Sequence, residues 1–139
     1  MNTNMNDPAD RSAAAKGQFT LSVEVEFAAA HHLRDYEGNC ARLHGHNWKV
    51  IVEMTGARLN AVGMVVDFKT MKKAARAAAE QLDHRYLNEI PPFDTINPTA
   101  EHIAVWFFDE LSVTLNQPTA RVSAITIWEN DRSAVTYRA

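Results

Sequence analysis

The sequence predicts an α+β domain whose strands and helices follow one another in the order ββααββ. Apolar and polar residues alternate with period two over residues 19–27 and 48–54, whereas apolar residues recur at helical spacing from residue 67 onward. The 139 residues, of which 46% are hydrophobic, are enough for one domain with a modest core. We therefore expect residues 18–139 to form a single domain and residues 1–17 to form a flexible polar arm.

Two strands are predicted in the first part of this domain. One face of the first strand carries Phe19, Leu21, Val23, Val25 and Phe27, and one face of the second carries Trp48, Val50, Val52 and Met54. Residues 34–40 lie between the strands and include Gly38 and Asn39, which predict a loop. The two strands are therefore expected to form a hairpin.

Two helices are predicted in the middle of the chain. Residues 67–82 repeat apolar side chains at helical spacing, and Asp67 is placed to cap the first turn. A second helix is expected to begin near the Asn-Pro-Thr sequence at residues 97–99, because Asn or Thr can cap a helix and proline suits its first turn. It should end at about residue 115.

Two further strands are predicted at the C-terminal end, over residues 121–129 and 133–138. Asn130 and Asp131 lie between them and are typical turn residues. These two strands complete the ββααββ order.

Charge and cysteine content exclude several classes of protein. A formal net charge of -3 argues against a general nucleic-acid binder, which usually has a basic excess. No stretch approaches the roughly 18 apolar residues of a membrane span, and the N-terminal segment lacks the apolar core of a signal peptide. The single cysteine excludes an intrachain disulfide and fits a reducing compartment. We therefore expect a cytoplasmic protein with no nucleic-acid or membrane partner.

The chemistry is concentrated between Phe27 and His46, a segment that holds four of the six histidines and the only cysteine. His44 and His46 flank Gly45, and in an extended strand this spacing points both imidazoles to the same face. His31, on or just after the preceding strand, would add a third imidazole. Three imidazoles suit zinc and leave a coordination position open for a substrate, which indicates catalysis.

Six short sequences occur in order along the chain. They are FAAAHHL, CARLHGH, GMVVDF, LDHRYLN, NPTAE and the late strand that ends in Glu129. Their order and spacing, over about residues 19–138, resemble the 6-pyruvoyl-tetrahydropterin synthase and 6-carboxy-tetrahydropterin synthase family. The resemblance implies a tunnelling fold (T-fold), in which a four-stranded antiparallel sheet carries two helices on one face. It also implies a homo-oligomer, in which three subunits form a twelve-stranded barrel and two trimers usually stack into a hexamer.

The resemblance assigns the metal ligands. His31, His44 and His46 match the family's zinc ligands, and His32 is a possible substitute for the first of them. An alternative is a closed structural site in which Cys40 is the fourth ligand, and such a site would be catalytically inert.

The resemblance also assigns a proton-transfer group. Cys40 matches the family's catalytic base and would act as a thiolate, which requires positive charge nearby. Asp83 and His84 match a dyad that assists the cysteine. Without these roles, Cys40 is a small buried side chain, His84 is a histidine at a helix C-terminus and Asp83 is a solvated carboxylate.

Glu129 matches the residue that binds the pterin ring. It shares a strand face with apolar residues, where a carboxylate is unfavourable unless a donor pair meets it, and a pterin offers a ring N–H beside an amino group. The alternative is a carboxylate in solvent at the strand end. Thr99 matches a position near the pterin pocket, although a capping role explains it nearly as well. Asn130 departs from the threonine that is common after the family's glutamate, so the hydrogen bonds beside the ring anchor are not assigned by the resemblance.

The Cys-x3-His-x-His spacing resembles the bacterial 6-carboxytetrahydropterin synthases of queuosine and deazapurine biosynthesis. The implied reaction converts 7,8-dihydroneopterin triphosphate into 6-carboxy-5,6,7,8-tetrahydropterin, acetaldehyde and triphosphate. Three alternatives are a 6-pyruvoyl-tetrahydropterin synthase, a pterin- or purine-binding module without turnover, and another tunnelling-fold enzyme such as an aldolase or a cyclohydrolase.

Overall fold

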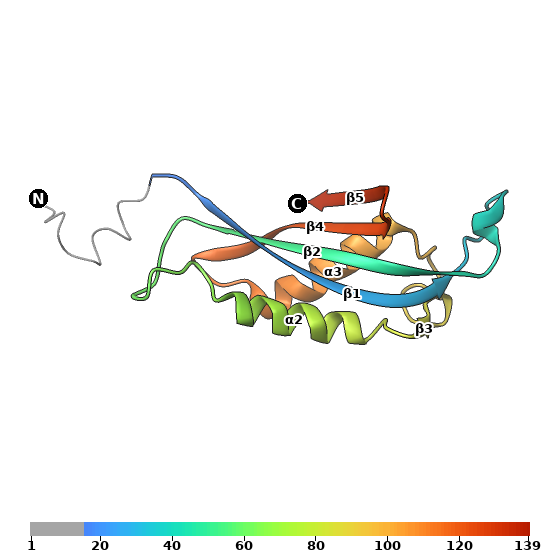
Figure 1. Ribbon diagram of the computed structural model, residues 1–139, viewed down its shortest axis with the longest axis horizontal. Coiled ribbons are helices and arrows are strands. Elements are labelled where there is room, and N and C mark those ends of the chain that lie inside the picture. Colours follow the sequence, from blue (N-terminus) through green and yellow to red (C-terminus); the bar gives the residue numbers. More distant parts are fainter. Residues whose placement is uncertain (1–15) are drawn as a thin grey trace, which may run out of the picture.

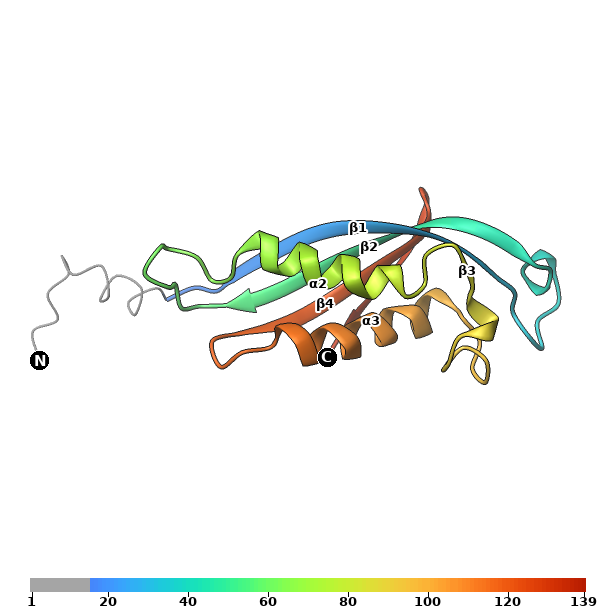
Figure 2. The same ribbon diagram turned by 90° about the horizontal axis from the view of Figure 1, so that it is seen from below.

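The computed structural model describes residues 16–139, so most of the predicted N-terminal arm, residues 1–15, lies outside the described residues. The domain is one curved sheet with two helices on a single face (Figure 1; Figure 2). Its strands are β1 (Phe19–His31), β2 (His44–Gly56), β3 (Arg85–Tyr86), β4 (Ala120–Asn130) and β5 (Ser133–Arg138), and its helices are α2 (Phe68–Glu80) and α3 (Ala100–Leu115). The predicted α+β class and the predicted order of the main elements are confirmed.

The strands lie in the order β3-β1-β2-β4-β5. β1 and β2 form the predicted hairpin, whose antiparallel register pairs Phe19 with Gly56 and His31 with His44. The four predicted strands are all present, and the two-residue strand β3 joins them by pairing in parallel with Ala29 and Ala30. Among residues 16–139 no other strand pairs with the outer edge of β1, and none pairs with the outer edge of β5.

Both helices begin at the predicted capping residues. An Asp67 side-chain oxygen accepts the Lys69 backbone N–H at 2.8 Å, and the Thr99 hydroxyl accepts the His102 backbone N–H at 3.1 Å. Pro98 precedes the cap and so lies outside the first turn, where it had been expected. Its carbonyl instead contacts a histidine of β1. Neither helix has the length and apolarity needed to cross a membrane.

The hydrophobic core fills the space between the sheet and the helices. The core faces of β1 and β2 continue without a break into the histidines, because His31 follows Phe27 and Ala29 in period two and His46 precedes Trp48 in the same way. The Phe27 and Trp48 rings stack with centroids 5.9 Å apart. The histidines therefore lie at one end of the apolar core, and His31 is only 1% exposed.

Candidate metal centre

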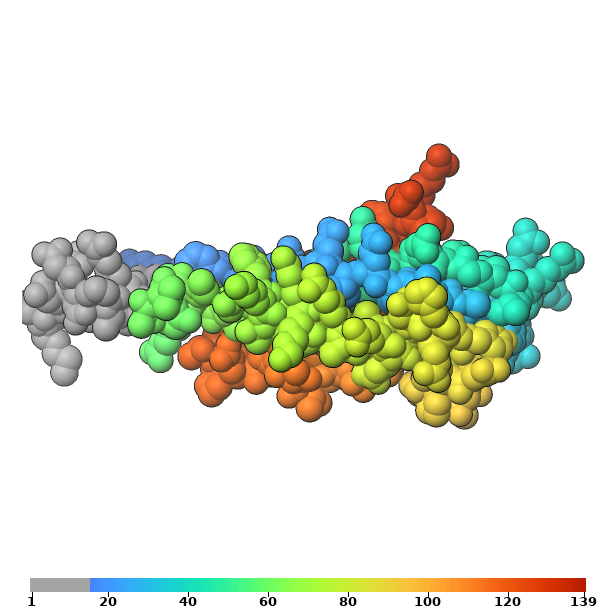
Figure 3. All heavy atoms as spheres, turned by 60° about the horizontal axis from the view of Figure 1, so that its bottom comes forward, coloured from blue at the N-terminus to red at the C-terminus, as the bar shows by residue number. Residues whose placement is uncertain are grey.

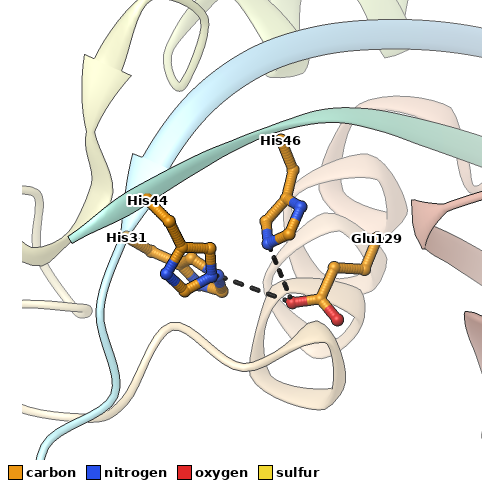
Figure 4. Close-up of side chains that lie close together, drawn as sticks. All are labelled: His31, His44, His46 and Glu129. Atoms are coloured by element: carbon orange, nitrogen blue, oxygen red, sulfur yellow. Dashed lines mark hydrogen bonds and ion pairs between the residues drawn. The ribbon is translucent and has the colours of Figure 1, made fainter. Parts of the chain in front are cut away.

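Four side chains converge at the end of the sheet where β1 finishes and β2 begins. His31, His44, His46 and Glu129 each offer one donor atom, and these four atoms all lie within 4.8 Å of one another (Figure 4). His31 is the last residue of β1, His44 and His46 open β2, and Glu129 is close to the end of β4. Alternation in each strand places all four on the helix-facing side of the sheet.

An indole ring lies beneath the histidine cluster. The centroid of the Trp48 ring is 4.9 Å from that of His31 and 5.1 Å from that of His46, with edge-to-face geometry in both cases. Trp48 is fully buried, and its indole N–H donates to the Ala29 carbonyl at 3.2 Å. This fixed ring limits the positions that the two imidazoles can adopt.

Backbone carbonyls determine which nitrogen of two histidines carries the hydrogen. The Nδ1 atom of His31 lies 2.7 Å from the Pro98 carbonyl oxygen, and the Nδ1 atom of His44 lies 2.6 Å from the Arg42 carbonyl oxygen. A carbonyl oxygen only accepts, so each Nδ1 atom is the donor and each neutral ring has a free lone pair on Nε2. Carbonyl partners of this kind are typical around the histidine ligands of metals.

The free nitrogens face one another. The Nε2 atoms of His31 and His44 are 2.9 Å apart, and two lone pairs at that distance repel each other unless a proton or cation lies beside them. Within residues 16–139 the buried Nε2 atom of His46 has no hydrogen-bond partner. A carboxylate oxygen of Glu129 lies 3.3 Å away, but the geometry of that contact is not that of a hydrogen bond. Three imidazole nitrogens and one carboxylate oxygen therefore form a donor set that fits Zn²⁺.

Burial keeps two of these imidazoles neutral. It lowers the pKa of His31 and of His46 below the usual value of about 6.5, because the charged form loses hydration. The neighbouring His44 lowers both further, whereas Glu129 opposes the effect, and the Pro98 carbonyl also opposes it at His31. Neutral imidazoles at neutral pH are the form that binds a metal.

These shifts predict how the metal-free protein responds to acid. The unfolded chain takes up protons on these histidines near pH 6.5, whereas the folded chain takes them up only at lower pH. The contribution of these neutral histidines to the free energy of unfolding is therefore fully present above pH 6.5. It is lost as the pH falls from 6.5 through their lower folded-state pKa values. We expect chelator-treated protein to show a lower free energy of unfolding in urea at pH 5.5 than at pH 7.5. Equal stability at the two pH values would contradict this.

His32 and Cys40, the two alternative ligands considered from the sequence, both lie outside the cluster. His32 bonds through Nδ1 to the Tyr86 hydroxyl and stacks on that ring, with centroids 5.8 Å apart. Cys40 belongs to a short 3₁₀ turn (Asn39–Ala41) in the loop between β1 and β2, and its donor atom is not one of the four that converge. The convergence of these four donors without Cys40 argues against the closed site in which cysteine is the fourth ligand.

Asp83 and His84 form a pair that is held against β1. Asp83 accepts the Ala28 backbone N–H at 2.9 Å and contacts the Nδ1 atom of His84 at 2.9 Å, while the His84 backbone N–H donates to the Ala28 carbonyl at 2.6 Å. The Ala28 N–H, followed by His84, holds the pKa of Asp83 below its usual value. In the described chain no hydrogen bond joins this pair to Cys40.

Of the two predicted substrate residues, Glu129 is one of the four that converge, and Thr99 is linked to the cluster through Pro98. The Thr99 hydroxyl caps α3, and Thr99 follows Pro98, whose carbonyl contacts His31. The position of Glu129 beside the histidines was not anticipated from the sequence. Two features could have indicated this position: the strand face that Glu129 shares with the apolar residues of β4, and the pairing of β2 with β4. Lys49 lies opposite Trp128, so in the same register Glu129 lies opposite Trp48.

Comparisons with known proteins agree on this fold and this family. The solved structure of 6-pyruvoyl tetrahydropterin synthase from Caenorhabditis elegans superposes with a TM-score of 0.77 at 26% identity, covering 88% of this chain and 96% of that one. A Synechocystis protein named 6-carboxy-5,6,7,8-tetrahydropterin synthase is 40% identical over 93 residues, which are 63% of this chain and 70% of the relative. The human 6-pyruvoyl tetrahydrobiopterin synthase is 33% identical over 135 residues, covering 87% and 92% of the two chains.

Residues 20–139 match the family described as 6-pyruvoyl tetrahydropterin synthase. The architecture is thus that of the tunnelling-fold synthases, as the sequence resemblance implied. The chain belongs to the 6-pyruvoyl tetrahydropterin synthase family, and the expectation that it is a lyase of this family is confirmed.

Proposed function

We propose that the protein is a zinc-dependent 6-carboxy-5,6,7,8-tetrahydropterin synthase, which acts in the cytoplasm on 7,8-dihydroneopterin triphosphate in queuosine or 7-deazapurine biosynthesis. The carrying observation is the convergence of three imidazole nitrogens, two of which have their other ring nitrogen held by a backbone carbonyl. The short spacing from Cys40 to His44 and His46 favours this activity over the pyruvoyl reaction. Relatives bear both the carboxy and the pyruvoyl name, so the choice between the two activities depends on this spacing.

In this proposal the histidines hold the metal and other side chains move protons. Zinc held by His31, His44 and His46 would supply Lewis acidity that stabilises negative charge developing on the substrate. Cys40, as a thiolate, would remove a proton from the substrate side chain. Asp83, kept ionised by its hydrogen bonds, would orient His84 and stabilise its protonated form during proton transfer.

The two candidate products differ in carbon count, so product analysis separates them. Formation of 6-carboxytetrahydropterin releases two carbons as acetaldehyde together with triphosphate, and it consumes one water. Formation of 6-pyruvoyltetrahydropterin releases triphosphate alone and keeps every carbon. We expect mass spectrometry, after incubation of the zinc-loaded protein with 7,8-dihydroneopterin triphosphate, to show the carboxy product and acetaldehyde. The pyruvoyl product alone would favour the second activity, and bound but unchanged substrate would indicate a binding module.

We also propose that the protein works as a homotrimer or homohexamer. Among residues 16–139, strand pairing covers the outer edge of β1 only at Ala29 and Ala30, and β5 ends the other side of the sheet. Unpaired strand edges favour pairing with another copy, which would close the sheet into a barrel. Such an assembly could also bring Cys40 of one subunit to the Asp83 and His84 pair of another.

The assembly can be tested directly. Multi-angle light scattering should give a mass about three or six times the 15.6 kDa of one chain. A monomer at working concentration would contradict both the barrel and a site shared between subunits.

Glu129 is proposed to bind the pterin ring through its carboxylate. Glu129→Gln keeps the side-chain shape but removes the charge, so it should weaken substrate binding by on the order of 1.5 to 3 kcal/mol, or about 10- to 150-fold in KM. Zinc content should stay unchanged, because three histidines remain. Steady-state kinetics with metal analysis would check both expectations. An unaltered KM would remove Glu129 from the pterin site, and loss of zinc would identify it as a ligand.

A further inference from the structure

The segment that follows β1 is held by two asparagine side chains that imitate a neighbouring strand. The Asn88 amide accepts the backbone N–H of His32 at 3.0 Å and donates to its carbonyl at 3.0 Å. The Asn97 amide does the same at Arg34, accepting the N–H and donating to the carbonyl, both at 2.9 Å. We call Asn88 and Asn97 the asparagine clamp. It satisfies the backbone of two alternate residues, His32 and Arg34, that no strand of the described chain pairs with.

The residue between these two contacts is bonded to the loop that carries the cysteine. The backbone N–H of Leu33 donates to the Cys40 carbonyl at 2.8 Å. The clamp therefore holds one side of the 32–34 segment, while Cys40 is attached to the other side. His31, a candidate metal ligand, immediately precedes the segment.

Asn97 is also the residue directly before Pro98, whose carbonyl orients His31. Pro98 comes next in the chain, and its carbonyl oxygen lies 2.7 Å from the His31 Nδ1 atom. The Asn97 carbonyl accepts the Thr99 backbone N–H at 2.8 Å and contacts the Nδ1 atom of His102 at 2.6 Å. Asn97 is thus bonded through its side chain to the segment after β1 and through its carbonyl to the start of α3.

The guanidinium of Arg34 reinforces the same junction. It donates to the backbone carbonyls of Phe93 at 2.9 Å, of Asn88 at 3.3 Å and of Ile96 at 3.3 Å. The segment that carries both asparagines, coloured yellow in Figure 3, packs against the end of the helical layer. Asn88 is only 7% exposed, so its amide depends on these internal partners.

We propose that Asn88 and Asn97 are positioning residues that hold the His31 imidazole and the Cys40 loop in fixed relation to each other. Asn97 precedes Pro98, whose carbonyl is the outer partner of the His31 ring, and loss of an outer partner typically reduces metal affinity about 10- to 100-fold. The part of the proposal that concerns His31 requires only that the histidine cluster binds a metal. The part that concerns Cys40 rests on the proposed function.

The test compares Asn97→Ala, Asn97→Asp and Asn88→Ala with a control, Asn116→Ala. Asn116 accepts a backbone N–H from Val122 at 2.7 Å, but it lies at the opposite end of α3, about 24 Å along the helix axis. Zinc affinity, measured by competition with a chromophoric chelator, should fall about 10- to 100-fold in both alanine variants of the clamp and stay unchanged in the control. Asn97→Asp should also lose affinity, because it keeps the acceptor but places a carboxylate against the Arg34 carbonyl.

A second measurement follows the 32–34 segment itself. Hydrogen exchange at the Leu33 amide should become faster in the clamp variants and not in Asn116→Ala. At saturating zinc, kcat should fall about tenfold or more with KM little changed, because displacement of Cys40 affects proton removal rather than substrate binding.

The possible results test the role of the asparagine clamp independently of the proposed function. Zinc affinity within twofold of wild type in Asn97→Ala, with Leu33 exchange unchanged, would overturn the proposal. An equal loss of affinity in Asn116→Ala would also overturn it, because the effect would then be general destabilisation. If Asn97→Ala does not fold, Asn97→Asp and Asn88→Ala decide the matter by the same measurements. Full turnover in Cys40→Ala would refute the proposed role of the cysteine, while zinc affinity and Leu33 exchange would still test the clamp.

Discussion

Replacing Cys40 with alanine should leave a folded protein with its full complement of zinc and very little activity. The thiol lies outside the converging donor set, so its removal takes away no metal ligand. The backbone bond from Leu33 to the Cys40 carbonyl does not depend on the side chain and should persist. Loss of a positioned base should lower turnover by about 10²-fold or more. Elemental analysis, circular dichroism and product formation would measure the three properties.

The same variant tests the two alternative roles of the cysteine. If zinc is lost together with activity, Cys40 is a ligand, the site is closed and the proposed mechanism is wrong in its central step. If the variant retains both zinc and turnover, Cys40 is only a small half-buried side chain. Cys40→Ser is a useful companion variant, because a hydroxyl of similar size is a much weaker acid than a thiol and should also be inactive.

The main elements of the fold could be predicted because each one leaves a periodic trace in the sequence. Strand alternation placed β1 and β2, and Asp67 and Thr99 marked the starts of the two helices. Strand β3 could not be predicted, since two residues are too few to show a period, and Arg85 and Tyr86 pair with β1 only because the chain turns back there after α2. Tertiary contact, rather than local pattern, creates that strand.

In the candidate site, too, some features follow from local sequence pattern and others only from tertiary contacts. The convergence of His31, His44 and His46 follows from strand alternation and from the register of one hairpin, both of which act over short distances in the sequence. The approach of Glu129 and the asparagine clamp depend on contacts between segments more than 50 residues apart, as in the 56-residue separation of His32 and Asn88. Side-chain amides that bond to a backbone leave no periodic pattern, so the sequence gives no sign of them.

Replacing His46 with alanine should have the opposite order of effects from the cysteine variant, with the loss of metal coming first. The variant removes one of three nitrogen donors, so zinc affinity should fall by more than the roughly 10- to 100-fold that follows loss of an outer partner. Activity should disappear as a consequence. His32→Ala is the matched control, because His32 bonds to Tyr86 rather than to the cluster and its removal should leave zinc binding intact.

The His46→Ala variant also tests whether Glu129 or His46 is the third metal ligand. The Glu129 carboxylate oxygen lies 3.5 Å from the His31 Nε2 atom, close enough to serve as a replacement donor. If His46→Ala still binds one zinc per chain at wild-type affinity, the metal is held by His31, His44 and Glu129, and the carboxylate cannot at the same time bind the pterin ring. Adding Glu129→Gln to that variant should then release the zinc. If His46→Ala alone loses the metal, the three-histidine site stands and Glu129 is left free to bind the substrate.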